Sequence, residues 1–137
     1  MSGMNRTTIY ELAGGDAPFR RLVDGFYARV EAEPLLRPMY PGDLTASREH
    51  LFLFITQYFG GPPRYNALRG HPRLRLRHAA FAIGQRERDA WVMHMLAAID
   101  EAGFAEPARS VLREYFARAA TFLINQPANP HSIELLG

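Results

Sequence analysis

The chain contains neither cysteine nor lysine, and these two absences exclude several classes of chemistry. Without cysteine it can form no disulfide, thiolate nucleophile, iron–sulfur cluster or CxxCH haem attachment, and no thiolate can ligate a haem iron. Without lysine it has neither a Schiff-base amine nor the lysine of a phosphate-binding P-loop. All 16 of its basic residues are therefore arginines.

Long hydrophobic runs are also missing. No apolar stretch approaches the roughly 18–20 residues that a membrane-spanning helix needs. The first residues, MSGMNRTTIYELAGG, lack the charged and then apolar order of a secretory signal. We therefore expect a cytoplasmic protein with no membrane partner.

A strong excess of one charge is absent as well, because 16 basic residues stand against 14 acidic ones and the net charge is +2. The pI of 9.3 is high mainly because few groups titrate between histidine and tyrosine when lysine is absent. It is weak evidence for a nucleic-acid partner, and we expect none. The 137 residues, 47% of them hydrophobic, fit one folded domain over residues 1–137, with loose termini at 1–6 and 126–137.

Several segments have the 3.6-residue period of amphipathic helices, and no convincing pair of strands appears, so the expected fold class is all-α. The capping-box spacing of Thr8 and Glu11, followed by Gly14 and Gly15, predicts a short helix within residues 7–15. A second helix is expected over residues 16–34, with Asp16 as its N-cap. Its predicted core stripe is Phe19, Leu22, Val23, Phe26, Tyr27 and Val30.

Three further helices are expected in residues 45–61, 85–103 and 106–125. The predicted apolar side of the first of these is Leu51, Phe54, Ile55, Tyr58 and Phe59. The second has Trp91, Met95 and Ile99 on one stripe and Gly103 at its end. In the third, the apolar residues in phase are Val111, Leu112, Tyr115, Phe116, Ala119 and Leu123.

The stretch GHPRLRLRHAAFAIG, residues 70–84, is ambiguous. The alternation in RLRLRH is typical of a strand, but a strand here has no obvious partner, and Pro72 suits the first turn of a helix. A helix as far as Phe81 places Leu74, His78 and Phe81 on one face, with arginines beside it. This arrangement presents one histidine within an apolar stripe.

No pair of histidines has the spacing of a zinc site, and no GxSxG, Walker or dinucleotide motif occurs. His78 is either a hydrogen-bonded core histidine or an axial ligand to a haem iron. Arg77 is then either a solvated charge or a partner for a haem propionate. Tyr27, Tyr40 and Trp91 are likewise either core residues or hydrogen-bond donors to a diatomic ligand in an apolar cavity.

The motifs YELAGGDAPFRRLVDGFY, LLRPMYP, QYFGGPPRY, RGHPRLRLRHAAFAIG and ERDAWVMHM, in this order, resemble the group II truncated haemoglobins of bacteria. The likeness covers residues 8–125, and its most specific part is the block RGHPRLRxRHxxFxIG followed by ERDxW. It implies a two-over-two helical sandwich around haem b. His78 then matches the iron ligand at the metal site, and Arg77 matches a propionate partner.

The resemblance also assigns the distal side of the haem. Tyr27, Tyr40 and Trp91 match the donors that stabilise a bound ligand, Leu51 matches the apolar residue above the iron, and Ser47 matches the distal gate. The further residues expected to contact haem are Phe54, Phe81, Ile83, Met95, His50 and Tyr65.

These parts predict a haem protein that binds oxygen, nitric oxide, carbon monoxide or peroxide. Donors in a low-dielectric pocket slow oxygen release, which favours nitric-oxide dioxygenase or peroxidase-like chemistry, served by an unidentified reductase. An alternative is a haem-based gas sensor or electron-transfer module that acts through a partner protein. Another is a haem-free helical module whose arginine run binds nucleic acid. A homodimer is a candidate assembly.

Overall fold

The computed structural model describes residues 7–70 and 83–122. Its helices are α1 (Ile9–Ala13), α2 (Asp16–Glu31), the short 3-10 helix η2 (Arg37–Met39), α3 (Thr45–Tyr58), α4 (Arg64–Arg69), α6 (Gln85–Ala102) and α7 (Ala108–Phe122). These ranges contain no strand, which confirms the all-α class. Nor do they contain a helix with the length and apolar character needed to cross a membrane. The ambiguous arginine-rich stretch lies in residues 71–82, outside the described part.

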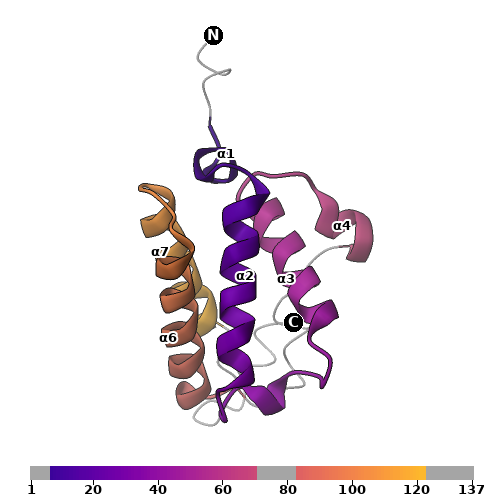
Figure 1. Cartoon of the computed structure of the whole chain (residues 1–137), viewed down its shortest axis with the longest axis vertical. Coiled ribbons are helices and arrows are strands. Elements are labelled where there is room, and N and C mark those ends of the chain that lie inside the picture. Colours follow the sequence, from indigo (N-terminus) through magenta and orange to yellow (C-terminus); the bar gives the residue numbers. More distant parts are fainter. Residues whose placement is uncertain (1–6, 71–82, 123–137) are drawn as a thin grey trace.

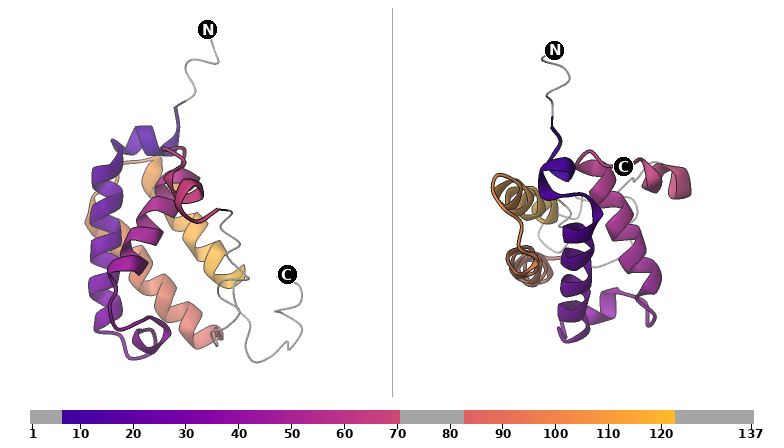
Figure 2. Two further views of the ribbon diagram at one scale, coloured as in Figure 1. Left: turned by 90° about the vertical axis from the view of Figure 1, so that its right-hand side faces the viewer. Right: turned by 45° about the horizontal axis from the view of Figure 1, so that its top comes forward.

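Two pairs of helices build the fold. Helix α2 packs beside α3, α6 packs beside α7, and α2 also packs against α6. Figure 1 shows α2 between α3 on one side and the orange pair α6–α7 on the other. Figure 2, right, looks nearly along α6 and α7 and shows the two pairs as separate layers. The predicted two-over-two helical sandwich is therefore confirmed.

The core lies where α2 meets α6. The stripe predicted for α2 is confirmed, because Phe19, Leu22, Val23, Phe26, Tyr27 and Val30 are all buried. Met95 and Ile99 of α6 lie fully buried in the same cluster. The 3.6-residue period thus places one continuous apolar face on each helix, and burial of these faces holds the two layers together.

The start of α2 differs from the prediction. Gly15, with φ 88°, is the N-cap, and Asp16 is the first helical residue. The Asp16 carboxylate accepts hydrogen bonds from the Tyr10 hydroxyl (2.7 Å) and from both terminal nitrogens of Arg64 (2.8 and 3.1 Å). Because those donors occupy it, Asp16 ties α1 and α4 to the start of α2 instead of capping its own helix. The Arg64 guanidinium holds the pKa of Asp16 below its usual range.

The buried face of α3 also differs from the predicted one. Phe52, Leu53, Ile55 and Thr56 are buried, whereas Tyr58 is 56% exposed. The Arg20 guanidinium covers the Phe52 ring at 3.7 Å, and the Thr56 hydroxyl donates to the Phe52 carbonyl at 2.9 Å. The cation–π contact with Arg20 and the hydrogen bond from Thr56 therefore allow Phe52 and Thr56 to take core positions. Leu51 and Phe54, predicted both for the apolar side of this helix and for the haem site, line a cavity.

Two glycines after α3 let its end pack tightly on α1. The Tyr10 N–H donates to the Phe59 carbonyl at 2.9 Å, and Gly60 has φ 102°. A Cβ on Gly60 would lie 2.4 Å from the Cβ of Thr8, the capping residue of α1. A Cβ on Gly14, the residue that ends α1 with φ 98°, would have no neighbouring atom within 4 Å.

Gly14 and Gly60 together give a matched test of the junction between α1 and α3. Gly14→Ala introduces only the left-handed backbone penalty and is expected to cost about 1–2 kcal/mol in the free energy of unfolding. Gly60→Ala adds a steric clash with Thr8, for which overpacking costs about 1–3 kcal/mol more. Urea unfolding followed by circular dichroism measures both values. Equal destabilisation by the two substitutions would contradict the close packing described above.

Candidate functional site

A cavity of about 450 Å³ lies between the two helix layers. Its walls come from α2, α3, α4, α6 and α7 and from the corner after η2. The predicted site residues that line it are Tyr27, Tyr40, Ser47, His50, Leu51, Phe54, Tyr65, Ile83 and Trp91. Residues far apart in the sequence are thus brought to one space.

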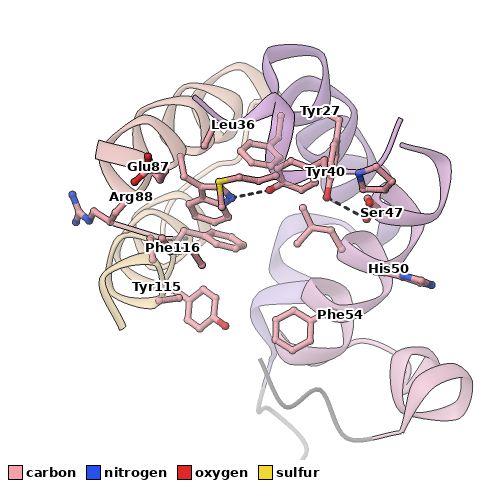
Figure 3. A pocket seen from close by; sticks show the side chains of 18 of the residues that line it. Tyr27, Leu36, Tyr40, Ser47, His50, Phe54, Glu87, Arg88, Tyr115 and Phe116 are labelled. Atoms are coloured by element: carbon pink, nitrogen blue, oxygen red, sulfur yellow. Dashed lines mark hydrogen bonds between the residues drawn. The ribbon is translucent and has the colours of Figure 1, made fainter. Parts of the chain in front are cut away.

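One end of the cavity carries Tyr27, Tyr40 and Ser47, as Figure 3 shows. The Trp91 indole N–H donates to the Tyr40 hydroxyl oxygen at 3.3 Å. The Tyr27 hydroxyl donates to the Ser47 carbonyl, also at 3.3 Å. The rings of Tyr27 and Tyr40 meet edge to face with centroids 5.6 Å apart, and Phe26 packs against both Tyr27 and Trp91. Ring packing therefore fixes where these polar atoms lie.

Both tyrosines at this end remain protonated. Burial raises the pKa of Tyr27, and the neighbouring Tyr40 phenol raises it further. Burial also raises the pKa of Tyr40, against a smaller opposing effect of the hydrogen bond from Trp91. The hydrogen bond that Tyr40 makes with Trp91 uses its oxygen as the acceptor, and no bond donated by the Tyr40 O–H is found among the described residues. Tyr40 therefore keeps a proton that it can donate to a ligand in the cavity.

The corner that carries Tyr40 is held in place by its own hydrogen bonds. The Arg37 guanidinium donates to the carbonyls of Tyr40 (3.3 Å) and Gly42 (2.9 Å). Before the corner, Glu33 lies 2.8 Å from His94 Nε2 of α6, and this hydrogen bond holds the pKa of Glu33 below its usual range. The loop is thus fastened both to itself and to the helix that carries Trp91.

Charged side chains stand at the edge of the cavity. Arg69 of α4 lies 3.1 Å from His50 Nδ1, and Figure 3 shows the His50 side chain directed outward. Arg88 of α6 donates to the Thr121 hydroxyl at 2.9 Å. The cavity thus combines an apolar interior, one polar end and a rim that carries arginines.

Some predicted site residues are not found at the cavity. Met95 is fully buried between α2 and α6 and does not line it. It lies one turn beyond Trp91 on α6, where the helix faces the core. His78, Arg77 and Phe81 lie outside the described residues, so the predicted proximal side of the haem stays a prediction.

Other lining residues were not predicted as part of a site. Met39, Glu87, Arg88, Tyr115, Phe116 and Ala119 all line the cavity. The sequence pattern did place Tyr115, Phe116 and Ala119 on the apolar stripe of their helix, but it assigned them to the core. Apolar residues at helical spacing show that one face of a helix is buried, but they do not show whether that face meets a cavity or another helix.

Comparison with known proteins gives the family. Residues 8–125 match the model of the family described as bacterial-like globin. The chain is 40% identical over 124 residues to the group 2 truncated hemoglobin YjbI of Bacillus subtilis, covering 90% of this chain and 93% of that protein.

Two crystal structures show the same fold. The hemoglobin of Chloroflexus aurantiacus superposes with a TM-score of 0.87 at 61% identity, over 88% of this chain and all of that one. The truncated oxygen-avid haemoglobin of Bacillus subtilis superposes with a TM-score of 0.82 at 39% identity, over 87% of this chain and 100% of that one. The chain thus belongs to the bacterial-like globin family, as a truncated haemoglobin of group II, a class that binds haem and small gas ligands such as oxygen.

Proposed function

We propose that the cavity holds haem b and that its polar end either retains oxygen for reaction with nitric oxide or polarises the O–O bond of a peroxide that takes the place of oxygen. The observation that carries this proposal is the hydrogen bond from Trp91 to Tyr40 at one end of a largely apolar cavity. It leaves the Tyr40 O–H available to a ligand, in surroundings from which apolar walls exclude water.

The lining of the cavity fits a flat apolar group with carboxylates at one edge. Leu51 and Phe54 of α3 and Phe116 of α7 supply apolar walls. The volume of about 450 Å³ lies within the range of roughly 300–1,000 Å³ that is usual for ligand and cofactor pockets. Arg69 at the rim is suited to pair with a propionate.

The remaining roles in haem binding follow the family resemblance. We assign His78 as the iron ligand and Arg77 as a further propionate partner, with Phe81 beside the haem. Ile83, Tyr65 and Ser47 line the cavity, which supports their assigned places, and His50 lies at its rim beside Arg69.

When bound, haem supplies an iron with one coordination position open to a diatomic gas. Tyr40 donates its O–H to the partial negative charge of the bound gas, in a low dielectric that strengthens the bond. Trp91 fixes the Tyr40 oxygen and polarises its hydroxyl by donating to it. Tyr27 is anchored to the Ser47 carbonyl and supports the Tyr40 ring.

Slow oxygen release follows from these donors, and it is unsuited to oxygen delivery. The similar protein of Bacillus subtilis is described as oxygen-avid, which supports this proposal. Nitric oxide, dioxygen and one electron would together give nitrate, and a haem held by His78 would supply that electron. A reductase that restores the electron is therefore part of the proposal.

Substitutions at the polar end test whether Tyr40 donates to the ligand directly and Trp91 acts through it. A hydrogen bond to a charged group contributes about 1.5–3 kcal/mol, so Tyr40→Phe is expected to raise the oxygen dissociation rate roughly ten- to a hundredfold. Trp91→Phe removes a neutral hydrogen bond of about 0.5–1.5 kcal/mol and is expected to raise the rate less. Stopped-flow replacement of oxygen by carbon monoxide measures these rates.

The double variant distinguishes indirect from direct action of Trp91. If Trp91 acts through Tyr40, Tyr40→Phe/Trp91→Phe releases oxygen at the rate of Tyr40→Phe alone. Met39→Leu serves as the control, because it changes the cavity wall without removing a donor. Additive effects of the two substitutions would show that Trp91 reaches the ligand itself.

The reaction with nitric oxide is the second test of function. Mixing the oxygenated, haem-loaded protein with an equimolar amount of nitric oxide is expected to give equimolar nitrate and ferric protein. Absorption spectra and ion chromatography measure the two products. Exchange of oxygen for nitric oxide without nitrate would contradict dioxygenase chemistry and would favour the gas-sensor alternative.

A further inference from the structure

One tyrosine stands apart from the others in its exposure. All six tyrosines of the chain lie in the described residues, and Tyr58, the last residue of α3, is the one classed as exposed, at 56%. The others are buried or half-buried. A reaction that joins the tyrosines of two molecules is therefore open to Tyr58 and hindered for the rest.

Tyr58 is in ring contact with the wall of the cavity. Its ring centroid lies 4.5 Å from that of Tyr115 and 5.9 Å from that of Phe54, and both partners line the cavity. Phe116 extends the series inward, 5.0 Å from Tyr115 and 5.8 Å from Trp91. Neighbouring aromatic rings thus lead without a gap from the polar end of the cavity to the surface.

The protein surroundings decide where an oxidising equivalent comes to rest on this series. At neutral pH a phenol that loses an electron must also lose its proton. Burial, with an added effect of Tyr58, raises the pKa of Tyr115 to about 12, and no acceptor among the described residues takes its O–H. Water reaches Tyr58 and can take its proton, so a phenoxyl radical comes to rest on Tyr58, whereas Tyr115 carries the oxidising equivalent only in passing.

We propose that Tyr58 is the site at which oxidising equivalents leave the protein after it has reacted with a peroxide, and that Tyr115 relays them from the cavity. The inference rests on the proposed peroxide chemistry. Hydrogen peroxide accepts two electrons and two protons, its O–O bond breaks, and two waters form. Two protein molecules each supply one electron and one proton through Tyr58. The two phenoxyl radicals then form one carbon–carbon bond, which is a dityrosine link between the molecules.

The test uses the haem-loaded full chain and hydrogen peroxide. Dityrosine fluorescence, covalent dimers in denaturing gels and mapping of the linked peptide are the readouts. The wild type is expected to give dimers linked through Tyr58. Tyr58→Phe is expected to lose them, although its first reaction with one equivalent of peroxide is as fast as that of the wild type. Tyr10→Phe removes a half-buried tyrosine that does not line the cavity and is expected to change nothing.

The role of Tyr115 is tested with an oxidant that acts from outside. Tyr115→Phe is expected to lose most of the peroxide-driven dimers. It should keep the full yield when a photo-oxidised ruthenium complex with persulfate attacks the surface directly, because that reaction bypasses the relay. Loss of dimers under both conditions would mean that the substitution disturbs Tyr58 itself and would overturn the relay.

The remaining outcomes separate this inference from the proposed function. Peroxide consumption with equal dimer yields in the wild type and Tyr58→Phe would overturn the exit site and leave the peroxide chemistry intact. Equal yields in the wild type and Tyr115→Phe after peroxide would overturn the relay. A wild-type protein that consumes no peroxide would overturn both the peroxide chemistry and the inference that rests on it.

Discussion

The hydrogen bond from the Trp91 indole to the Tyr40 hydroxyl connects the two parts of the protein that form the polar end of the cavity. Trp91 lies on α6, and Tyr40 lies on the corner between α2 and α3. Because the indole N–H donates to the tyrosine oxygen, the Tyr40 O–H is left available, and we propose that it donates to a ligand in the cavity. The slow oxygen release that we propose depends on this hydrogen bond.

The rest of the fold holds Trp91 and Tyr40 in position relative to each other. Packing of α2 on α6 through residues such as Phe26 and Met95 sets the distance between the helices, and Phe26 also contacts the Trp91 ring. Arg37 and the Glu33–His94 pair fasten the corner, so the position of Tyr40 does not depend on a long free loop. A donor that is already fixed in position loses little conformational entropy when a ligand binds, which is the usual advantage of preorganised sites.

The sequence predicts the helices well because burial follows their period. The stripe of α2 from Phe19 to Val30 is an example, and all of it is buried. Prediction from the sequence fails where tertiary contacts compete with the local capping pattern or with the helical period. Asp16 is withdrawn from its capping role by Arg64 and Tyr10, and the buried side of α3 is rotated toward Phe52 because Arg20 covers that ring. Periodicity alone also cannot show that Tyr115 faces a cavity, and the roles of Tyr27, Tyr40 and Trp91 came from the family resemblance rather than from spacing.

The central claim is that the Tyr40 hydroxyl, oriented by Trp91, donates to the ligand, and the infrared spectrum of the carbon monoxide complex tests it most directly. A hydrogen bond to the ligand oxygen lowers the carbon–oxygen stretching frequency. Our account predicts that Tyr40→Phe moves this band to higher frequency and that adding Trp91→Phe moves it no further. An unchanged band in Tyr40→Phe would contradict the account.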